Sequence, residues 1–297
     1  MDNDDNTNNT GLLIVNDEET VLQFMAVKKD FPEIESWNYI VSTEYNSYES
    51  LNRVSQICER CKDLNKRVTW IEKENFSIYK LAILVSGYKK DTEKLIYTYL
   101  NDIDLVLLDK GVEEFVESSF KHDMINERSI KYTYDLSLLA SNNFKEIRQL
   151  SISKDTELEY RKLLESSIDA LDNINNSEMV LFSSSDIYDF DDKIHDKINH
   201  YLEDNYKDKK VAIKRHPIDF VRYNPDNVKV QYIPDNLTNT IVANDVDVPE
   251  TWVYPSSLLL RLKDKNIKIL NFKHITDKAY RELINLMKSN GLTLIEV

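Results

Sequence analysis

The sequence contains very little glycine. Only four glycines occur among 297 residues, and their positions cannot form a G-x-G-x-x-G motif or a Walker-type phosphate loop. Both motifs need glycine so that the backbone can approach a phosphate closely. The sequence therefore argues against a dinucleotide oxidoreductase of the usual fingerprint and against a P-loop NTPase. If a nucleotide binds, side chains and helix N-termini must hold its phosphate.

Positive charge and long apolar runs are scarce as well. The formal net charge is -14, and nucleic-acid binding needs clustered Lys and Arg, so we expect no nucleic acid as a partner. The apolar run from Leu81 to Val85 is far shorter than the roughly 20 residues that span a bilayer. Asp2 and Asp4 lie where a secretory signal would be basic. These features predict a cytoplasmic protein, and they leave a peripheral contact with the inner face of the membrane open.

Cysteine occurs only twice, as the C-x-x-C pair Cys58 and Cys61. This spacing is found in redox and zinc sites, but structural zinc needs four ligands and the sequence has no second pair. The pair lies within an amphipathic segment, 48–65. We interpret both residues as ordinary helix cysteines of a protein in a reducing compartment.

What the sequence does contain is an alternation of short β-rich runs and longer helical segments, which is typical of α/β proteins. In the first half, the predicted strands are 12–15, 39–41, 68–71 and 105–108, and the predicted helices begin at Glu18, Tyr48 and Phe76. Near-continuous apolar strands with helical crossovers indicate a parallel sheet that is covered on both faces.

A second α/β series follows a periodic helical segment, 155–173, and an Asn/Asp-rich stretch from Asp172 to Ser177. Its predicted strands are 179–182, 211–214, 228–232, 267–270 and 292–297, and its predicted helices are 191–206 and 277–289. We therefore predict two Rossmann-like α/β domains that face a cleft in a GT-B-like arrangement. The first is 1–172, with a disordered tail at 1–10, and the second is 177–297.

The run LLDKGVEEF, 107–115, places Asp109 at the end of a predicted strand and Gly111 at the turn into a helix. Ligands of open α/β sheets collect beyond the carboxyl ends of the strands, where a carboxylate can accept a proton from an attacking hydroxyl. Alternatively, Asp109 caps the following helix, and Glu113 and Glu114 favour the positive N-terminus of that helix. The spacing alone leaves both interpretations open.

A second strand, 211–214, ends in Lys214, and Arg215, His216 and Pro217 follow it. Lys214, Arg215 and His216 are the only three consecutive basic residues of this acidic chain and its concentrated positive spot. A histidine beside two cations at a strand end suits a phosphate group. The alternative for His216 is a surface histidine. That is how we interpret the other four histidines, His122, His195, His200 and His274.

Serine hydroxyls occur at two further places that suit a phosphate. Ser256 and Ser257 open an apolar segment near the C-terminus, and Ser184 follows the first predicted strand of the second domain. Serines at such positions also serve as helix caps and turn residues, so both interpretations stay open.

Two D-x-D motifs, 102–104 and 245–247, imitate the metal site of one glycosyltransferase class. The first motif precedes a strand, at the wrong end of the sheet for a ligand, and the second lies in a predicted loop. We therefore expect neither motif to bind a metal.

In chain order, the sequence presents a D-x-G-x-x-E-F element at 109–115, an H-P element at 216–217 and a Ser-Ser element at 256–257. This order resembles bacterial sialyltransferases of GT-B type: the lipooligosaccharide sialyltransferases of glycosyltransferase family 52 and, more distantly, the bacterial polysialyltransferases. The opening strand, 11–16, is also similar to theirs. The order of these elements is similar over most of the chain, but few individual residues are the same.

The resemblance implies that Asp109 is the general base and that His216 meets the donor phosphate and assists the departure of CMP. It implies that Ser256 and Ser257 bind the same phosphate and that Glu250 contacts the ribose hydroxyls. Lys214, Arg215, Pro217, Ser184 and Gly111 complete the predicted surroundings of these groups. The family usually has two acidic residues before the glycine, and here the second is Lys110.

The implied reaction is transfer of sialic acid from CMP-sialic acid to a hydroxyl of a glycan or glycolipid acceptor. It is a single inverting displacement that needs no metal and no cofactor. One alternative is a capsule or teichoic-type transferase that uses another cytidine-nucleotide donor, because such an enzyme also uses an H-P phosphate site. The other is a non-catalytic partner in glycan assembly with a degenerate cleft.

Overall fold

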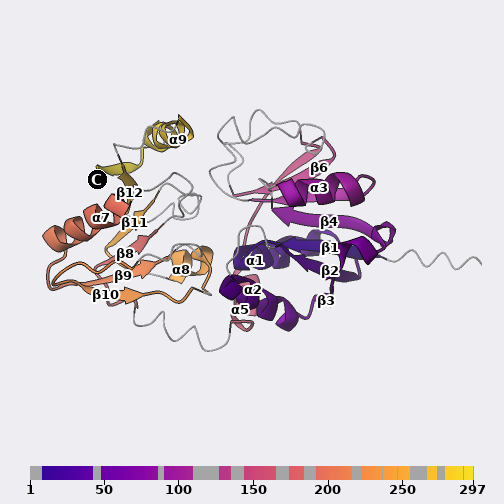
Figure 1. Cartoon of the computed structure of the whole chain (residues 1–297), viewed down its shortest axis with the longest axis horizontal. Helices are drawn as coiled ribbons and strands as arrows, with labels where there is room; N and C mark the ends of the chain where they lie inside the picture. The colour runs from indigo at the N-terminus through magenta and orange to yellow at the C-terminus, as the bar shows by residue number, and fades with distance from the viewer. Residues whose placement is uncertain are drawn as a thin grey trace, which may run out of the picture. The chain divides into compact units, whose positions relative to one another are not determined.

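The computed structural model of the chain divides into two compact units, which we treat as two domains (Figure 1). Among the described residues, the first domain runs to Leu163 and the second begins at Leu164. This division precedes the predicted boundary at 172–177. The residues that the structure describes are 9–42, 48–85, 90–109, 127–134, 144–164, 174–183, 192–215, 222–235, 237–245, 247–254, 266–272, 278–289 and 291–296.

The first domain contains a seven-stranded parallel sheet in the order β3-β2-β1-β4-β5-β6-β7. Its strands are β1 Thr10–Val15, β2 Ser36–Val41, β3 Leu64–Arg67, β4 Tyr79–Val85, β5 Asp104–Leu108, β6 Ser129–Thr133 and β7 Glu146–Gln149. The helices described in this domain are α1 Glu18–Val27, α2 Tyr48–Arg60, α3 Lys90–Tyr99 and α5 Lys154–Arg161. Because the strands are parallel, their carboxyl ends all meet at one edge of the sheet.

Both faces of this sheet are buried. Leu12, Leu84 and Leu107 belong to a core cluster that also contains Ile96 of α3, and Leu13, which points to the other face of β1, is fully buried too. Helix α1 contacts β1, β4 and β5 as well as α2 and α5, and nearly all of its residues are buried. The expectation of a parallel sheet covered on both faces is confirmed.

Packing requires one of the four glycines. Gly11 of β1 is the register partner of Trp37 in β2, and a Cβ atom at Gly11 would lie 2.3 Å from the Trp37 ring. The same ring contacts Phe24 of α1 edge to face, with 5.1 Å between the ring centroids. The missing side chain therefore lets a large indole fill the space between the sheet and α1.

The three tryptophans of the chain lie in different environments. Trp37 in the first domain is 4% exposed, and Trp252 in the second domain is 2% exposed. Trp70, which follows β3, is 65% exposed, and the ammonium group of Lys73 lies 5.3 Å from its ring centroid. Each domain thus contains one buried indole.

The second domain contains a six-stranded parallel sheet in the order β10-β9-β8-β11-β12-β13. Its strands are β8 Met179–Phe182, β9 Lys210–Lys214, β10 Lys229–Tyr232, β11 Glu250–Val253, β12 Ile267–Asn271 and β13 Thr293–Glu296. The helices described here are α7 Asp192–Asn205, α8 Asn239–Asp245 and α9 Lys278–Ser289. The predicted elements of this half are confirmed, and β11 and α8 were not predicted.

Two predictions for the first domain were wrong. The helix predicted from Phe76 is a single 3₁₀ turn, Phe76–Ile78, followed by β4, which lies between β1 and β5. A short apolar run that is buried on both faces is compatible with a strand and with a buried helix, because hydrophobic periodicity does not distinguish the two. The strand predicted at 68–71 lies four residues earlier in the structure, as β3 Leu64–Arg67. Ile71–Lys73 forms another 3₁₀ turn.

Candidate functional site

Asp109 directly follows β5, at the carboxyl edge of the first sheet, and is 2% exposed. Its Oδ2 accepts hydrogen bonds from Thr133 Oγ1 at 3.1 Å and from the backbone nitrogen of Tyr134 at 3.0 Å. Its Oδ1 is closed off from solvent and receives no hydrogen bond from the residues that the structure describes. The carboxylate therefore ties the end of β5 to the end of β6 through one oxygen and keeps the other uncommitted.

Gln23 of α1 reaches the same place from the adjacent helix. It is 1% exposed, and its Nε2 donates a 3.0 Å hydrogen bond to the backbone oxygen of Asp109. Gln23 Oε1, like Asp109 Oδ1, is buried without a donor among the described residues. Sequence reasoning missed Gln23, although a polar residue inside the apolar run VLQFMAV is a signal that it could have used.

The start of α1 adds carboxylates to this edge. Asp17, just beyond β1, caps α1 by accepting a 2.8 Å hydrogen bond from the backbone nitrogen of Thr20. Arg53 of α2 pairs with Glu18 at 3.2 Å, and the hydroxyl of Tyr134 donates to Glu19 at 3.3 Å. Around the ends of β1, β5 and β6, the carboxyl edge of the first sheet therefore carries acids and hydroxyl groups, which suits a neutral polyhydroxylated ligand better than a phosphate.

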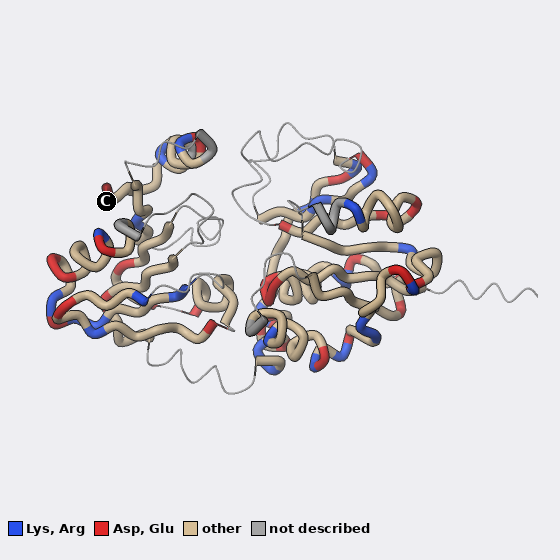
Figure 2. The backbone as a smooth tube through the Cα atoms, in the orientation of Figure 1, with Lys and Arg blue, Asp and Glu red and all other residues tan. Residues whose placement is uncertain are grey.

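At the carboxyl edge of the second sheet, Lys214 ends β9 and Arg215 follows it. Lys214 is 2% exposed, and its Nζ donates to the backbone oxygens of Arg215 and Asp235 at 3.3 and 3.4 Å. Arg215 Nη2 lies 3.1 Å from Asp235 Oδ2, and the guanidinium lies 5.2 Å from the ring centroid of Tyr232. Acidic and basic residues are interspersed over both domains (Figure 2).

Aromatic side chains accompany these cations. Tyr232 ends β10, and its hydroxyl donates to the backbone oxygen of Tyr223 at 3.0 Å. Tyr254 follows β11, and its hydroxyl oxygen lies 3.0 Å from that of Tyr223. His195 of α7 meets the Tyr223 ring edge-on with 5.3 Å between centroids, and its Nδ1 is buried without a partner among the described residues. His195 is therefore only partly exposed, which corrects its interpretation as a surface histidine.

Glu250 lies at the opposite edge of the second sheet, which corrects its assignment to the ribose. It is the first residue of β11 and the register partner of Met179, the first residue of β8. Its carboxylate accepts hydrogen bonds from Lys268 Nζ at 2.6 Å, from Trp252 Nε1 at 3.1 Å and from the hydroxyl of Tyr206. Burial alone would raise the pKa of Glu250, but the hydrogen bonds from Lys268, Tyr206 and Trp252 lower it below its ordinary value.

The remaining predicted site residues lie outside the described residues. They are Gly111 and the neighbouring Lys110, His216, Pro217, Ser184, Ser256 and Ser257. Asp109, Lys214 and Arg215 each lie at the carboxyl edge of a parallel sheet, as predicted. In α/β sheets, this is the edge where ligands collect.

Both cysteines are free and buried. Cys58 lies in α2 and Cys61 directly after it, at the C-terminal end of the helix. Burial and, to a smaller extent, the neighbouring Cys61 raise the pKa of the Cys58 thiol to about 12. A reactive C-x-x-C pair needs an accessible thiolate, so this geometry supports the interpretation as ordinary helix cysteines.

The D-x-D motif at 102–104 lies at the amino edge of the first sheet, where Asp104 begins β5. Asp245 ends α8, and the backbone nitrogen of Asp247 donates to Asn175 Oδ1 at 3.1 Å. Among the residues that the structure describes, no group of three or more His, Cys, Asp or Glu side chains is placed to hold a metal ion. Metal independence stays a prediction.

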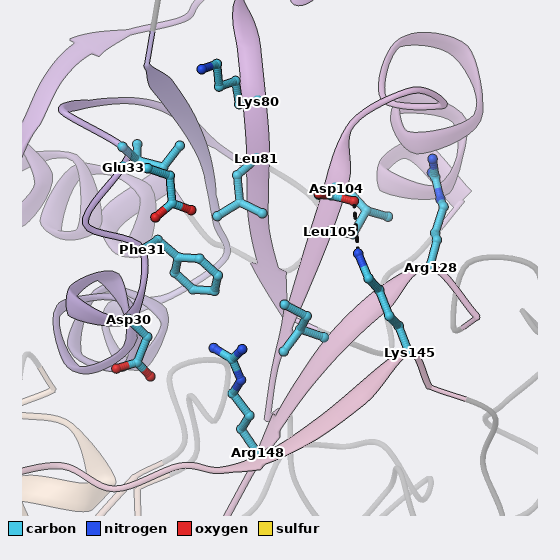
Figure 3. Close-up of a pocket in the computed structure, with 12 residues that line it drawn as sticks. Asp30, Phe31, Glu33, Lys80, Leu81, Asp104, Leu105, Arg128, Lys145 and Arg148 are labelled. Atoms are coloured by element: carbon cyan, nitrogen blue, oxygen red, sulfur yellow. Dashed lines mark ion pairs between the residues drawn. The ribbon is translucent and has the colours of Figure 1, made fainter.

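A pocket of about 360 Å³ opens at the amino edge of the first sheet (Figure 3). Apolar side chains such as Phe31, Leu81 and Leu105 line it. Three of its charged side chains form ion pairs: Lys145 lies 3.5 Å from Asp104, and Arg148 pairs with Glu146 outside the pocket. The pocket contains none of the predicted catalytic or nucleotide-binding residues.

Within the described part of the chain, no helix is long and apolar enough to cross a membrane.

No family model matches the chain, and no curated protein matches its sequence. Solved structures do match. The chain is similar to a putative UDP-N-acetylglucosamine 2-epimerase from Listeria monocytogenes, with a TM-score of 0.53 and 10% identity over 97% of this chain and 84% of that one. It is also similar to Arabidopsis thaliana UGT89C1 complexed with UDP-L-rhamnose, with a TM-score of 0.55 and 9% identity over 97% of this chain and 85% of that one.

A third similar structure is LpCGTa in complex with UDP, with a TM-score of 0.57 and 10% identity over 97% of this chain and 84% of that one. Identities this low show the fold alone. The two parallel sheets and these similarities confirm an α/β protein with two Rossmann-like domains of GT-B type. Membership of glycosyltransferase family 52 stays a prediction.

Proposed function

We propose that this protein is a glycosyltransferase that uses a nucleotide-sugar donor. The observation that carries the proposal is the contrast between two sheet edges. The carboxyl edge of the second sheet carries Lys214 and Arg215 beside tyrosine rings, which suits the phosphate and the base of a nucleotide. The carboxyl edge of the first sheet carries Asp109 with one oxygen uncommitted, which suits the hydroxyl of a sugar acceptor.

In the proposed reaction, Asp109 takes the proton of the acceptor hydroxyl. The hydroxyl oxygen forms a bond to the anomeric carbon of the donor sugar, and the bond from that carbon to the phosphate oxygen breaks. The electron pair leaves with the nucleotide. Arg215, and His216 beside it in the sequence, neutralise the charge that grows on the departing phosphate, which is an electrostatic role. Ser256 and Ser257 bind the same phosphate, as the resemblance to family 52 implies.

The proposed donor is CMP-sialic acid, and the proposed acceptor is a glycan or glycolipid. This choice rests on the D-x-G-x-x-E-F, H-P and Ser-Ser elements, because the similar solved structures carry UDP or UDP-sugar in their names. The reaction needs no metal or cofactor in this proposal. A cytoplasmic location with a peripheral membrane contact is part of the same proposal.

The first test is a thermal-shift series with CMP, UMP, UDP and GDP. A ligand that binds only the folded state raises the melting temperature, and at equal concentrations the ligand with the lower Kd raises it more. We expect CMP to stabilise the protein most. Stabilisation by UDP alone would move the proposal to a UDP-sugar donor, and no stabilisation by any nucleotide would contradict a nucleotide-dependent enzyme.

The second test is turnover of CMP-sialic acid and of CDP-linked donors, measured as nucleotide release with and without a panel of methyl glycosides as acceptors. Release from CMP-sialic acid but from no CDP-linked donor supports sialyl transfer. Release from a CDP-linked donor would instead favour the capsule or teichoic-type alternative. Nucleotide binding without turnover of any donor would favour the non-catalytic partner in glycan assembly.

A further inference from the structure

Asp109 is held more firmly than a simple surface carboxylate. Its backbone oxygen is fixed by Gln23 Nε2 at 3.0 Å, and its Oδ2 is fixed by Thr133 and by the backbone of Tyr134. These partners come from α1 and from the end of β6, so two separate elements determine where the carboxylate lies. With Oδ2 occupied, Oδ1 is the oxygen that faces a further donor.

Two buried oxygens at this place have no donor from the described part of the chain: Asp109 Oδ1 and Gln23 Oε1. The nearby donors already have acceptors. The Thr133 hydroxyl and the Tyr134 N–H serve Oδ2, Gln23 Nε2 serves the Asp109 backbone, and Lys131 Nζ donates to the backbone oxygen of Leu108 at 2.8 Å. Buried polar atoms of folded proteins almost always find a partner. These two exceptions lie on residues that the bond from Gln23 Nε2 to the Asp109 backbone joins, so they point to a bound molecule that supplies hydrogen-bond donors.

We propose that Asp109 Oδ1 and Gln23 Oε1 together bind a pair of O–H donors. In the substrate-free protein, the pair is the two O–H bonds of one water molecule. A water that donates to both oxygens bridges acceptors about 4.4 Å apart, because its two O–H bonds open at about 105° and each O–H···O distance is about 2.8 Å. The Gln23 Nε2 atom donates to the backbone oxygen of Asp109, and this bond holds the Gln23 amide beside Asp109.

In the substrate complex, two neighbouring hydroxyls of the acceptor sugar replace this water, an assignment that rests on the proposed function. The reacting O–H faces Asp109 Oδ1, which takes its proton, and the adjacent O–H donates to Gln23 Oε1. The acceptor class is therefore a sugar with a free hydroxyl next to the one that reacts. Gln23 is a positioning residue: it fixes the Asp109 backbone and orients the diol.

The first test needs no activity. A crystal structure of the full chain at about 1.5 Å resolution should show one water within hydrogen-bonding distance of both oxygens, and the Gln23→Met variant should lack it. The Asn38→Leu variant is the matched control. It removes another buried side-chain amide, whose Nδ2 donates to the Tyr79 hydroxyl at 3.0 Å, and it should keep the water. Clear density for both side chains without a bridging water would overturn the proposal.

The second test is nucleotide release from CMP-sialic acid with a methyl glycoside and with its analogues that lack one hydroxyl. For Gln23→Met, we expect kcat to fall roughly 10- to 100-fold with the KM for the donor unchanged, because misplacement of the reacting hydroxyl has an effect of this size. Asn38→Leu should keep both constants. Loss of the hydroxyl next to the reacting one should slow the wild-type protein but not Gln23→Met. An equal loss in both proteins would overturn the diol assignment.

The two tests fail separately. If the wild-type protein releases no nucleotide from any donor, the proposed function is wrong, while the crystallographic water still decides the binding of O–H donors by Asp109 and Gln23. If the wild-type protein turns over donor and the water is absent, the proposed function stands and this inference is wrong.

Discussion

Arg215 Nη2 and Asp235 Oδ2 lie 3.1 Å apart at the carboxyl edge of the second sheet. The guanidinium that would meet a donor phosphate is thus already paired with an acid of the same edge, at the end of β10. In the proposed site, Asp235 would compete with the phosphate for Arg215, and its negative charge lowers the positive potential that Lys214 and Arg215 create together. If a nucleotide binds at this edge as proposed, we expect the acid as well as the two cations to influence its affinity.

The Asp235→Asn variant should bind CMP more tightly. Asn keeps the backbone oxygen that Lys214 uses, but it removes the charge that competes for Arg215. Because partly exposed ion pairs contribute about 0.2–1 kcal/mol, we expect affinity to rise about 1.5- to 5-fold, measured by calorimetry. Asp226→Asn, an exposed acid just before β10, is the control and should have no effect. Unchanged CMP affinity in Asp235→Asn would show that Arg215 does not face the nucleotide.

His216→Ala should weaken CMP binding. The prediction follows from the sequence position of His216, directly after the Lys214–Arg215 pair. Loss of a charge-assisted hydrogen bond costs about 1.5–3 kcal/mol, which corresponds to about 10- to 150-fold in affinity. His200→Ala is the control, since His200 is exposed on α7. Equal CMP affinities for His216→Ala and the wild-type protein would remove His216 from the site.

Asp109→Asn should bind the donor normally but lose turnover. Asn retains an oxygen that can accept hydrogen bonds from Thr133 and Tyr134, so the link between β5 and β6 survives. It cannot take a proton, and loss of general base catalysis lowers kcat by about 100- to 10,000-fold. Glu113→Gln and Glu114→Gln are the controls, with the fold checked by melting temperature. Full activity of Asp109→Asn would end the proposed mechanism and leave a purely structural carboxylate.

Glu250→Gln should lower stability in a pH-dependent way. The pKa of Glu250 in the folded protein is below its ordinary value of 4.5, so its charge stabilises the fold above that pH. As pH falls through the lowered pKa, the carboxylate is protonated and the contribution disappears. We expect Glu250→Gln to be less stable than the wild-type protein by about 1–3 kcal/mol at pH 7. The gap should shrink below about pH 4.5 in urea denaturation; a constant gap would assign the loss to packing.

The two cysteines should resist alkylation in the folded protein. Burial raises the pKa of Cys58 to about 12, and Cys61 is buried beside it, so almost no accessible thiolate exists at pH 8. Iodoacetamide should label neither residue until urea unfolds the chain, as read by mass spectrometry. Rapid labelling of the native protein at either position would revive a redox role for the C-x-x-C pair.

The sequence predicted where strands end better than it predicted which side chains form hydrogen bonds with one another. The apolar run of β5 followed by a lone acid was enough to place Asp109 at the carboxyl edge of a parallel sheet. Its hydrogen bonds to Thr133 and Tyr134 could not be predicted, because β6 carries the polar residues Ser129, Lys131 and Thr133 and does not read as a buried strand.

The error at Glu250 has a clear physical origin. Without β11, the segment reads as a loop that leads to the Ser-Ser element, and Glu250 then lies near the nucleotide. Once 250–253 is a strand, residues at its two ends lie at opposite edges of the sheet. Glu250 therefore lies at the amino edge with Lys268, and Tyr254 lies at the carboxyl edge with Tyr223.

The placement of the tryptophans gives the chain its own spectroscopic reporters. Trp37 and Trp252 are buried in different domains, while Trp70 is largely exposed. Replacing Trp70 with phenylalanine would leave one shielded indole per domain, and a further Trp37→Phe or Trp252→Phe change would leave a single fluorophore. Emission from each variant during denaturation would then follow one domain at a time. Different midpoints would show that the domains unfold one after the other, and equal midpoints would indicate one cooperative unit.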